Sequence, residues 1–139
     1  MAAPHRQPNP ELLLHAVDET ANGVMLRGAK ACGISALNSH EMLVIPTTTT
    51  TERDDAYATF FALPSDAEGV TFVIDSESHS ATRSGDSIVN RAATAFQEQE
   101  ALCVFDDVIV PWERIFMYRE FEFSEQIADP YKFSFCFDA

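Results

Sequence analysis

A loop of small residues is the segment of this chain best suited to chemistry. Between residues 28 and 41 a strand-like stretch passes through small and polar residues and returns to a strand. Because small side chains let a flat ligand approach the backbone closely, this loop could receive a planar ring. Backbone amides, together with Ser35, Asn38 and Ser39, could hold the polar edge of that ring. From spacing alone, the alternative of an ordinary surface connection stays open.

The standard catalytic and metal-binding signatures are absent from the sequence. There is no G-x-S-x-G motif and no glycine-rich nucleotide loop, and the chain has only 5 Gly. Adjacent strand residues point to opposite faces, so Asp106 and Asp107 cannot share a proton, and we expect them at a strand end, bonded to a turn or to Arg114. No histidines pair at metal-ligand spacing among His5, His15, His40 and His79. The spacing therefore identifies no catalytic residue and no metal ligand.

Composition limits the classes of partner. The chain has 139 residues, with 22 acidic and 9 basic side chains, and a net charge of -13. Such a charge repels phosphate backbones and anionic lipid surfaces, so we expect neither nucleic-acid nor membrane binding. Hydrophobic residues make up 46% of the chain, which is enough for a core, and no apolar run approaches the roughly 20 residues of a membrane span.

The three cysteines are far apart and lack the spacing of a zinc site: Cys32, Cys103 and Cys136. Cys103 lies in an apolar, strand-like run, so we expect a buried, inert thiol at this position. The N-terminal residues contain no apolar segment typical of a secretory signal. These features favour a reduced protein of the cytoplasm.

Most of the chain is predicted to be β-strand. Asn22-Gly23 predicts a hairpin because both residues accept a positive φ. Residues 75–86 are polar and predict a long loop, and Ser124 can begin a helix that Pro130 interrupts. The sequence therefore predicts a mainly β sandwich or barrel with at most one helix at each end. The expected strands are 12–17, 24–31, 40–45, 56–63, 70–74, 101–105, 108–110 and 112–123.

Several stretches of the sequence resemble the 4-hydroxyphenylacetate 3-hydroxylase family, which also includes 4-hydroxybutyryl-CoA dehydratase. The matching stretches occur in the order typical of the family and cover roughly residues 8 to 123. They are Gly23–Lys30, Leu37–Glu41, Val44–Thr47, Tyr57–Ala58, Phe61–Val70 and, the most specific of them, Phe105–Phe116.

The resemblance implies an acyl-CoA dehydrogenase-like fold, in which a middle β domain and two helical domains share a flavin. It implies an N-terminal tail at residues 1–9, a flavin-facing middle β domain at residues 10–123, and the start of a truncated C-terminal helical segment at residues 124–139. Helical domains outside this sequence, or contacts within a homo-oligomer, would complete the flavin pocket.

The resemblance also implies a cofactor site. It assigns FAD binding to five consecutive residues: Cys32, Gly33, Ile34, Ser35 and Ala36. The family usually has a threonine where this chain has Ile34, and isoleucine has no side-chain donor, so the backbone amide or Ser35 would replace it. The sequence also differs from the family pattern at Ala93–Ala95, where the family has a Ser-Ser-Arg-like run.

The implied function is one wall of the FAD pocket in a flavin-dependent 3-monooxygenase of the 4-hydroxyphenylacetate type. A reductase would supply the reduced FAD, and the substrate would be a phenol. Two alternatives stay open: the middle domain of an enzyme like 4-hydroxybutyryl-CoA dehydratase, which acts on acyl-CoA, and a non-catalytic β domain remnant. The resemblance leaves open whether this chain alone is an enzyme.

Overall fold

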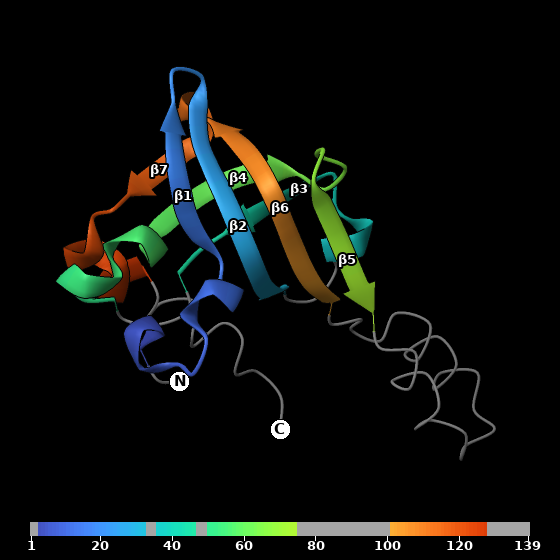
Figure 1. Cartoon of the computed structure of the whole chain (residues 1–139). Helices are drawn as coiled ribbons and strands as arrows, with labels where there is room; N and C mark the ends of the chain where they lie inside the picture. Colours follow the sequence, from blue (N-terminus) through green and yellow to red (C-terminus); the bar gives the residue numbers. More distant parts are fainter. Residues whose placement is uncertain (1–2, 33–35, 47–49, 75–100, 128–139) are drawn as a thin grey trace, which may run out of the picture.

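The computed structural model describes residues 3–32, 36–46, 50–74 and 101–127, which fold into two antiparallel sheets (Figure 1). One sheet has the order β1-β2-β6-β5, with the strands His15–Thr20 (β1), Gly23–Cys32 (β2), Ala101–Pro111 (β6) and Val70–Ile74 (β5). The other has the order β3-β4-β7, with the strands Glu41–Val44 (β3), Thr59–Pro64 (β4) and Ile115–Tyr118 (β7).

Among the described residues, helical structure is limited to short turns. Residues 124–127 form one turn of helix, and the part of the chain that the structure describes contains no helix long and apolar enough to cross a membrane. The 3-10 turns are Pro4–Arg6 (η1), Pro10–Leu12 (η2), Ala36–Asn38 (η3), Glu52–Tyr57 (η4), Trp112–Arg114 (η6) and Phe121–Phe123 (η7).

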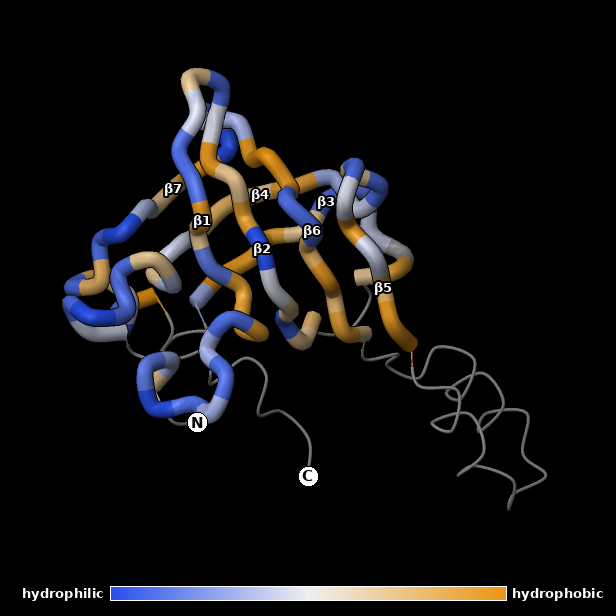
Figure 2. Tube along the Cα trace, viewed as in Figure 1, coloured by the Kyte–Doolittle hydropathy of each residue, from blue (hydrophilic) through white to orange (hydrophobic). Residues whose placement is uncertain are grey.

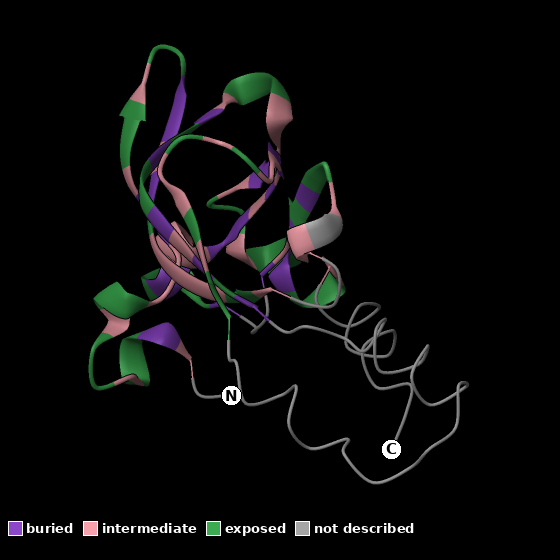
Figure 3. Cartoon of the chain, turned by 90° about the vertical axis from the view of Figure 1, so that its right-hand side faces the viewer, coloured by how far each residue is buried: buried purple, intermediate pink, exposed green. Residues whose placement is uncertain are grey.

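The core lies between the two sheets, and hydrophobic residues recur along their strands (Figure 2). In β3, β4 and β6 buried residues alternate with more exposed ones (Figure 3). In β4 the buried residues alternate with partly exposed ones, and the ring of Phe61 meets Phe105 of β6 edge to face with centroids 6.2 Å apart. Among the described strands no ladder joins one sheet to the other, so the architecture is a sandwich. The prediction of a mainly β fold with little helix is confirmed.

The predicted hairpin is present, but its physical reason differs from the expected one. Thr20 pairs with Gly23, and neither Asn22 nor Gly23 has a positive φ. A Cβ on Gly23 would collide with the carbonyl oxygen of Val110 on β6. Glycine is needed here because two strands approach each other closely, and the Thr20 hydroxyl closes the turn by donating to the Gly23 carbonyl at 2.9 Å.

The two expected strands 101–105 and 108–110 are one continuous strand, β6. Asp106 and Asp107 form a bulge within it, where the register against β2 shifts and Asp107 has a φ of 54°. Asp107 accepts two hydrogen bonds from Arg27, at 2.7 and 2.8 Å. The expected partner Arg114 instead pairs with Glu41 at 2.9 Å, so that prediction is wrong.

Other strand boundaries also differ from the prediction, and the largest differences are in β1, β4 and β7, the last of which begins at Ile115 because Trp112–Arg114 form η6. β1 begins at His15 because Pro10 starts a 3-10 turn over the expected first residues. β4 begins at Thr59 because residues 52–57 form η4. β7 ends at Tyr118, where Arg119 takes a φ of 57° and turns the chain away from the extended path. Residues 75–86 and Pro130 lie outside the described residues.

The expectation of an inert free thiol at Cys103 is wrong, because Cys103 forms a disulfide with Cys32. The register places Lys30 opposite Cys103 and Cys32 opposite Ala101, so the two cysteines are diagonal neighbours on the inner face of β2 and β6. Their Cα atoms are 6.0 Å apart, within the range of disulfides. The bond ties the last residue of β2 to the beginning of β6 at the same end of the first sheet.

Candidate functional site

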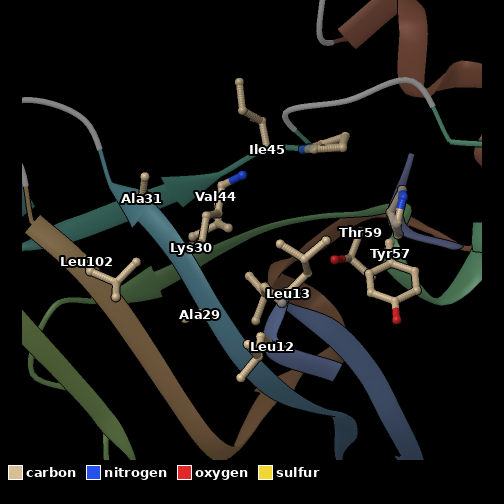
Figure 4. Close-up of a pocket in the computed structure, with 13 residues that line it drawn as sticks. Leu12, Leu13, Ala29, Lys30, Ala31, Val44, Ile45, Tyr57, Thr59 and Leu102 are labelled. Atoms are coloured by element: carbon tan, nitrogen blue, oxygen red, sulfur yellow. The ribbon is translucent and has the colours of Figure 1, made fainter. Parts of the chain in front are cut away.

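A cavity of about 300 Å³ lies at the end of the sandwich where β2 finishes, and we call it the open-end pocket (Figure 4). The N-terminal segment, β2, the end of β3, the η4–β4 connection and β6 all contribute to it. Its lining residues are Pro4, Leu12–Leu14, Ala29–Ala31, Val44–Pro46, Tyr57, Thr59 and Leu102. This volume is at the lower end of the range for small-molecule pockets.

The pocket lies where β2 extends beyond the end of its pairing with β1. Pairing between the two ends at a single bridge from Leu13 to Ala29, and Leu14 donates to the Ala29 carbonyl at 3.1 Å. Gly28 allows the N-terminal segment to approach β2 this closely, since Gly28 has a φ of 116° and a Cβ there would lie 2.6 Å from the Leu13 carbonyl carbon. Beyond Ala29, β2 has no neighbouring strand on that side among the described residues.

Lys30 is the cationic side chain of the open-end pocket. In Figure 4 it runs from β2 toward β3 and Val44. Burial against this apolar lining lowers the pKa of Lys30 from 10.5 to about 8, because the charged amine loses water. Within the described part of the chain, Lys30 has no hydrogen-bond or ion-pair partner.

Tyr57 and Thr59 supply the other polar side chains of the pocket lining. Burial raises the pKa of Tyr57, and the nearby carboxylates of Glu11 and Asp54 raise it further. The ring of Tyr57 packs against His15 with centroids 5.3 Å apart, and His15 Nδ1 lies 2.7 Å from the Leu13 carbonyl oxygen. These contacts hold the side chain of Tyr57 in place at one wall of the pocket.

Asp54 and His5 form a separate titratable pair that anchors the N-terminal segment. The buried Asp54 carboxylate accepts the His5 backbone amide at 2.9 Å and the Thr51 hydroxyl at 2.7 Å, and it lies 2.8 Å from His5 Nδ1. Burial acts to raise the pKa of Asp54, but the hydrogen bonds from Thr51 and His5 outweigh it and lower this pKa. The pair holds Pro4 at the pocket wall.

Of the five predicted FAD-binding residues, the structure describes Cys32 and Ala36. Cys32 ends β2 in the disulfide and Ala36 begins η3, whereas Gly33, Ile34 and Ser35 lie outside the described residues. The predicted segment directly follows Ala31 of the pocket wall. Within the described ranges, no group of three or more His, Cys, Asp or Glu side chains could hold a metal ion.

Sequence reasoning did not assign Lys30 to the site, because the residue lies within the predicted strand 24–31 and outside the predicted FAD segment. The alternation of β2 contained the signal: Val24 and Leu26 are buried, and residue 30 has the same parity. Arg27, of opposite parity, is exposed. The register shift against β6 leaves the alternation of β2 intact, because the extra residue lies in β6.

Comparison with known proteins gives consistent matches along this chain. A family model described as "4-hydroxyphenylacetate 3-hydroxylase N terminal" matches residues 1–117. The 4-hydroxybutyryl-CoA dehydratase/vinylacetyl-CoA-Delta-isomerase of Clostridium aminobutyricum is 37% identical over 91% of the chain. The oxygenase component of 4-hydroxyphenylacetate 3-monooxygenase from Thermus thermophilus is 34% identical over 86% of it. The chain spans 26% and 24% of these relatives, about a quarter of their length.

Solved structures of the same two kinds of enzyme also match this chain. A 4-hydroxybutyryl-CoA dehydratase from N. maritimus superposes with a TM-score of 0.74 at 35% identity, over 88% of this chain and 24% of that one. The oxygenase component of 4-hydroxyphenylacetate 3-monooxygenase complexed with FAD superposes with a TM-score of 0.73 at 30% identity, over 94% of this chain and 26% of that one. Both relatives therefore contain a domain with this fold.

Proposed function

The chain belongs to the 4-hydroxyphenylacetate 3-hydroxylase family, and from this premise we propose that it forms one wall of the FAD pocket in a flavin-dependent 3-monooxygenase of that type. The observation that carries the proposal is the open end of β2. There the strand passes Ala29 without a neighbour among the described residues and leads directly into the segment from Cys32 to Ala36.

The described residues at the open end of β2 fit a flavin ring. Ala29 and Ala31 are small, so a planar ring can reach the backbone, and the free edge of β2 offers amide and carbonyl groups to its polar edge. The disulfide draws the Cys32 side chain inward, away from this edge. Cys32 and Ala36, with the intervening Gly33, Ile34 and Ser35, are the residues that would hold FAD.

The role of this chain in the reaction is to orient a cofactor and to keep water away. FAD, when bound, would supply the oxidative chemistry that transfers oxygen to a phenol. The apolar side chains around the pocket, among them Leu13, Val44 and Ile45, would exclude water from one face of the ring. A reductase that supplies reduced FAD, helical domains or a second copy that complete the pocket, and a cytoplasmic location belong to the same proposal.

A second candidate function is favoured by a specific observation. The dehydratase of C. aminobutyricum is 37% identical over 91% of this chain, and the substrate would then be an acyl-CoA rather than a phenol. Thermal shifts with a phenol and with a CoA ester distinguish the two. A larger shift with the phenol supports the monooxygenase, and a larger shift with the CoA ester supports the dehydratase.

The proposal is tested by FAD titration of the chain and of the variant Ile34→Thr. If residue 34 lies beside the flavin, one added hydrogen bond is expected to tighten FAD binding about fivefold. Ile109→Thr is the matched control, because Ile109 is exposed on β6 at the hairpin end of the sandwich. Unchanged affinity in a folded Ile34→Thr variant contradicts this placement. Absence of FAD binding in every folded form would mean that the pocket needs the helical domains or a second copy to hold the flavin.

A further inference from the structure

The Cys32–Cys103 disulfide joins one accessible cysteine to one buried cysteine. Cys103 is completely buried in the core, whereas Cys32, the last residue of β2, is only partly buried. The Cys32 sulfur is therefore the one that a small dithiol can attack. Disulfides in the cytoplasm, the location proposed for this chain, are usually transient and redox-sensing rather than structural.

The disulfide supports a part of β2 that has a neighbouring strand on one side only. As far as Ala29, β2 lies between β1 and β6, but beyond Ala29 only β6 pairs with it among the described residues. The last register pair is Cys32 with Ala101, and the disulfide runs diagonally from this pair to Cys103. Loss of the bond leaves the end of β2 held by one ladder, whereas the rest of the strand keeps both of its neighbours.

The register also places a cationic residue beside the buried cysteine. Lys30 pairs directly with Cys103 across β2 and β6, so the two Cβ atoms lie on the same inner face, roughly 5 Å apart. A nearby ammonium group favours a thiolate over a thiol, and a sulfur leaves as the thiolate during disulfide exchange. No carboxylate of the described residues forms an ion pair with Lys30, so its charge is available to the sulfur.

We propose that the Cys32–Cys103 pair is a redox switch that fixes or releases the end of β2 and, on the basis of the proposed function, thereby controls FAD binding at the segment that follows. A thiolate of an external dithiol attacks the Cys32 sulfur, the bond to Cys103 breaks, and the Cys103 thiolate takes a proton. The second thiol of the reductant then displaces Cys32, so two electrons and two protons pass to the protein and the reductant becomes a disulfide. An oxidised dithiol reverses these steps. The disulfide form is pre-organised for FAD.

The test compares the oxidised chain with the chain reduced by dithiothreitol under native conditions, after anaerobic removal of the reductant. Reduction should release two thiols per chain. The backbone ¹⁵N order parameters of residues 30–32 should fall from about 0.85 to below about 0.6, because the end of β2 loses its cross-link. Residues 24–26, which pair with both β1 and β6, are the internal control and should not change. FAD should bind the reduced chain about fivefold more weakly.

Two pairs of variants sharpen the comparison. Cys32→Ser cannot form the bond, so it should behave like the reduced chain with or without dithiothreitol. Cys136→Ser is its matched control and should keep the full response, since Cys136 takes no part in this bond. Lys30→Met should be reduced about threefold more slowly than Arg27→Met, which removes a positive charge from the outer face of the same strand.

Equal order parameters at residues 30–32 in the two forms of the unmodified chain would overturn the inference, and this comparison holds even if a variant fails to fold. Reduction that proceeds only in denaturant would overturn it as well. Equal FAD affinity of the two forms would contradict the control of binding, and equal reduction rates of the two charge variants would contradict the role of Lys30. If neither form binds FAD, the proposed function fails separately, and the order parameters alone support or overturn the switch.

Discussion

The two ends of the β sandwich are built in opposite ways. At the hairpin end, Trp112 donates to the Thr20 carbonyl at 3.1 Å and Tyr118 donates to Glu19 at 2.9 Å, so polar groups are paired. At the open end, β2 extends beyond β1, residues of both sheets line a cavity of about 300 Å³, and Lys30 has no partner among the described residues. One end is closed by paired polar groups, and the other leaves the amine of Lys30 without a partner among the described residues.

Arg27 and Lys30 show this difference within one strand. Arg27 points outward and forms a bidentate pair with Asp107, which raises its own pKa and lowers the pKa of Asp107. Lys30, three residues later, points inward, and burial lowers its pKa. The comparison teaches that residues near a site can be arranged against stability, whereas residues far from it are arranged for stability.

The largest expected effect comes from the disulfide at the open end. Cys32→Ser in the oxidised protein should lower the free energy of unfolding by about 4 kcal/mol, because the bond closes a loop with a sequence separation of 71. Urea unfolding of the oxidised protein measures this effect. Cys136→Ser is the matched control, since Cys136 takes no part in this bond. Equal stability of Cys32→Ser and the unmodified chain would show that the open end does not depend on the cross-link.

At the hairpin end, Gly23→Ala should lower the free energy of unfolding by about 3 kcal/mol. The new methyl group would collide with the Val110 backbone, which cannot move without disrupting β6. Chemical denaturation measures the change, and Ala21→Ser at the exposed turn next to it should have little effect. A loss below about 1 kcal/mol for Gly23→Ala would mean that this end is more adaptable than the comparison states.

The smallest expected effect is a gain. Lys30→Met should raise the free energy of unfolding at pH 7 by about 1–2 kcal/mol, allowing for screening at a partly exposed site. The folded pKa of Lys30, about 8, is below its unfolded value of 10.5, so the unfolded chain binds more protons between these pH values. The stability of the unmodified chain relative to Lys30→Met should therefore rise from pH 8 to pH 10.

Urea unfolding of both proteins at several pH values measures this difference in stability. The pKa values of Tyr57 and Tyr118 are raised as well, but both proteins contain these tyrosines, so their contribution to the pH dependence cancels in the difference. Arg27→Met should show no comparable gain, because its charge is exposed and paired. If Lys30→Met destabilises the fold at pH 7, the amine has a partner that stabilises it, and the contrast between the two ends is wrong.

Local patterns in the sequence predicted much of the fold. The strand at residues 70–74 has the expected bounds, and the hairpin at Asn22-Gly23 forms as expected. The position of the hairpin could be predicted from its turn residues, but the reason for Gly23 is its close approach to Val110 of β6, which the local sequence does not show. The continuity of β6 through Asp107 was not predictable in this way, since a bulge is stabilised by the distant Arg27.

Less of the candidate site could be predicted, because its parts are far apart in the sequence. The resemblance indicated the segment from Cys32 to Ala36, but Cys32 is separated by 71 residues from the partner that bonds it. The isolation of Lys30 depends on which side chains the other strands place nearby. Parity alone puts Lys30 inward, and the three-dimensional structure is needed to show that no described acid meets it.

The most direct test of the account is nuclear magnetic resonance of the ¹⁵N-labelled chain during titration with FAD. The account predicts saturable shifts of backbone amides at the open end, at Ala29–Cys32, Ala36 and Val44, and unchanged signals at the hairpin end around Thr20 and Trp112. Shifts centred on the hairpin end would contradict it. So would saturable FAD binding that leaves Ala29–Cys32 unperturbed.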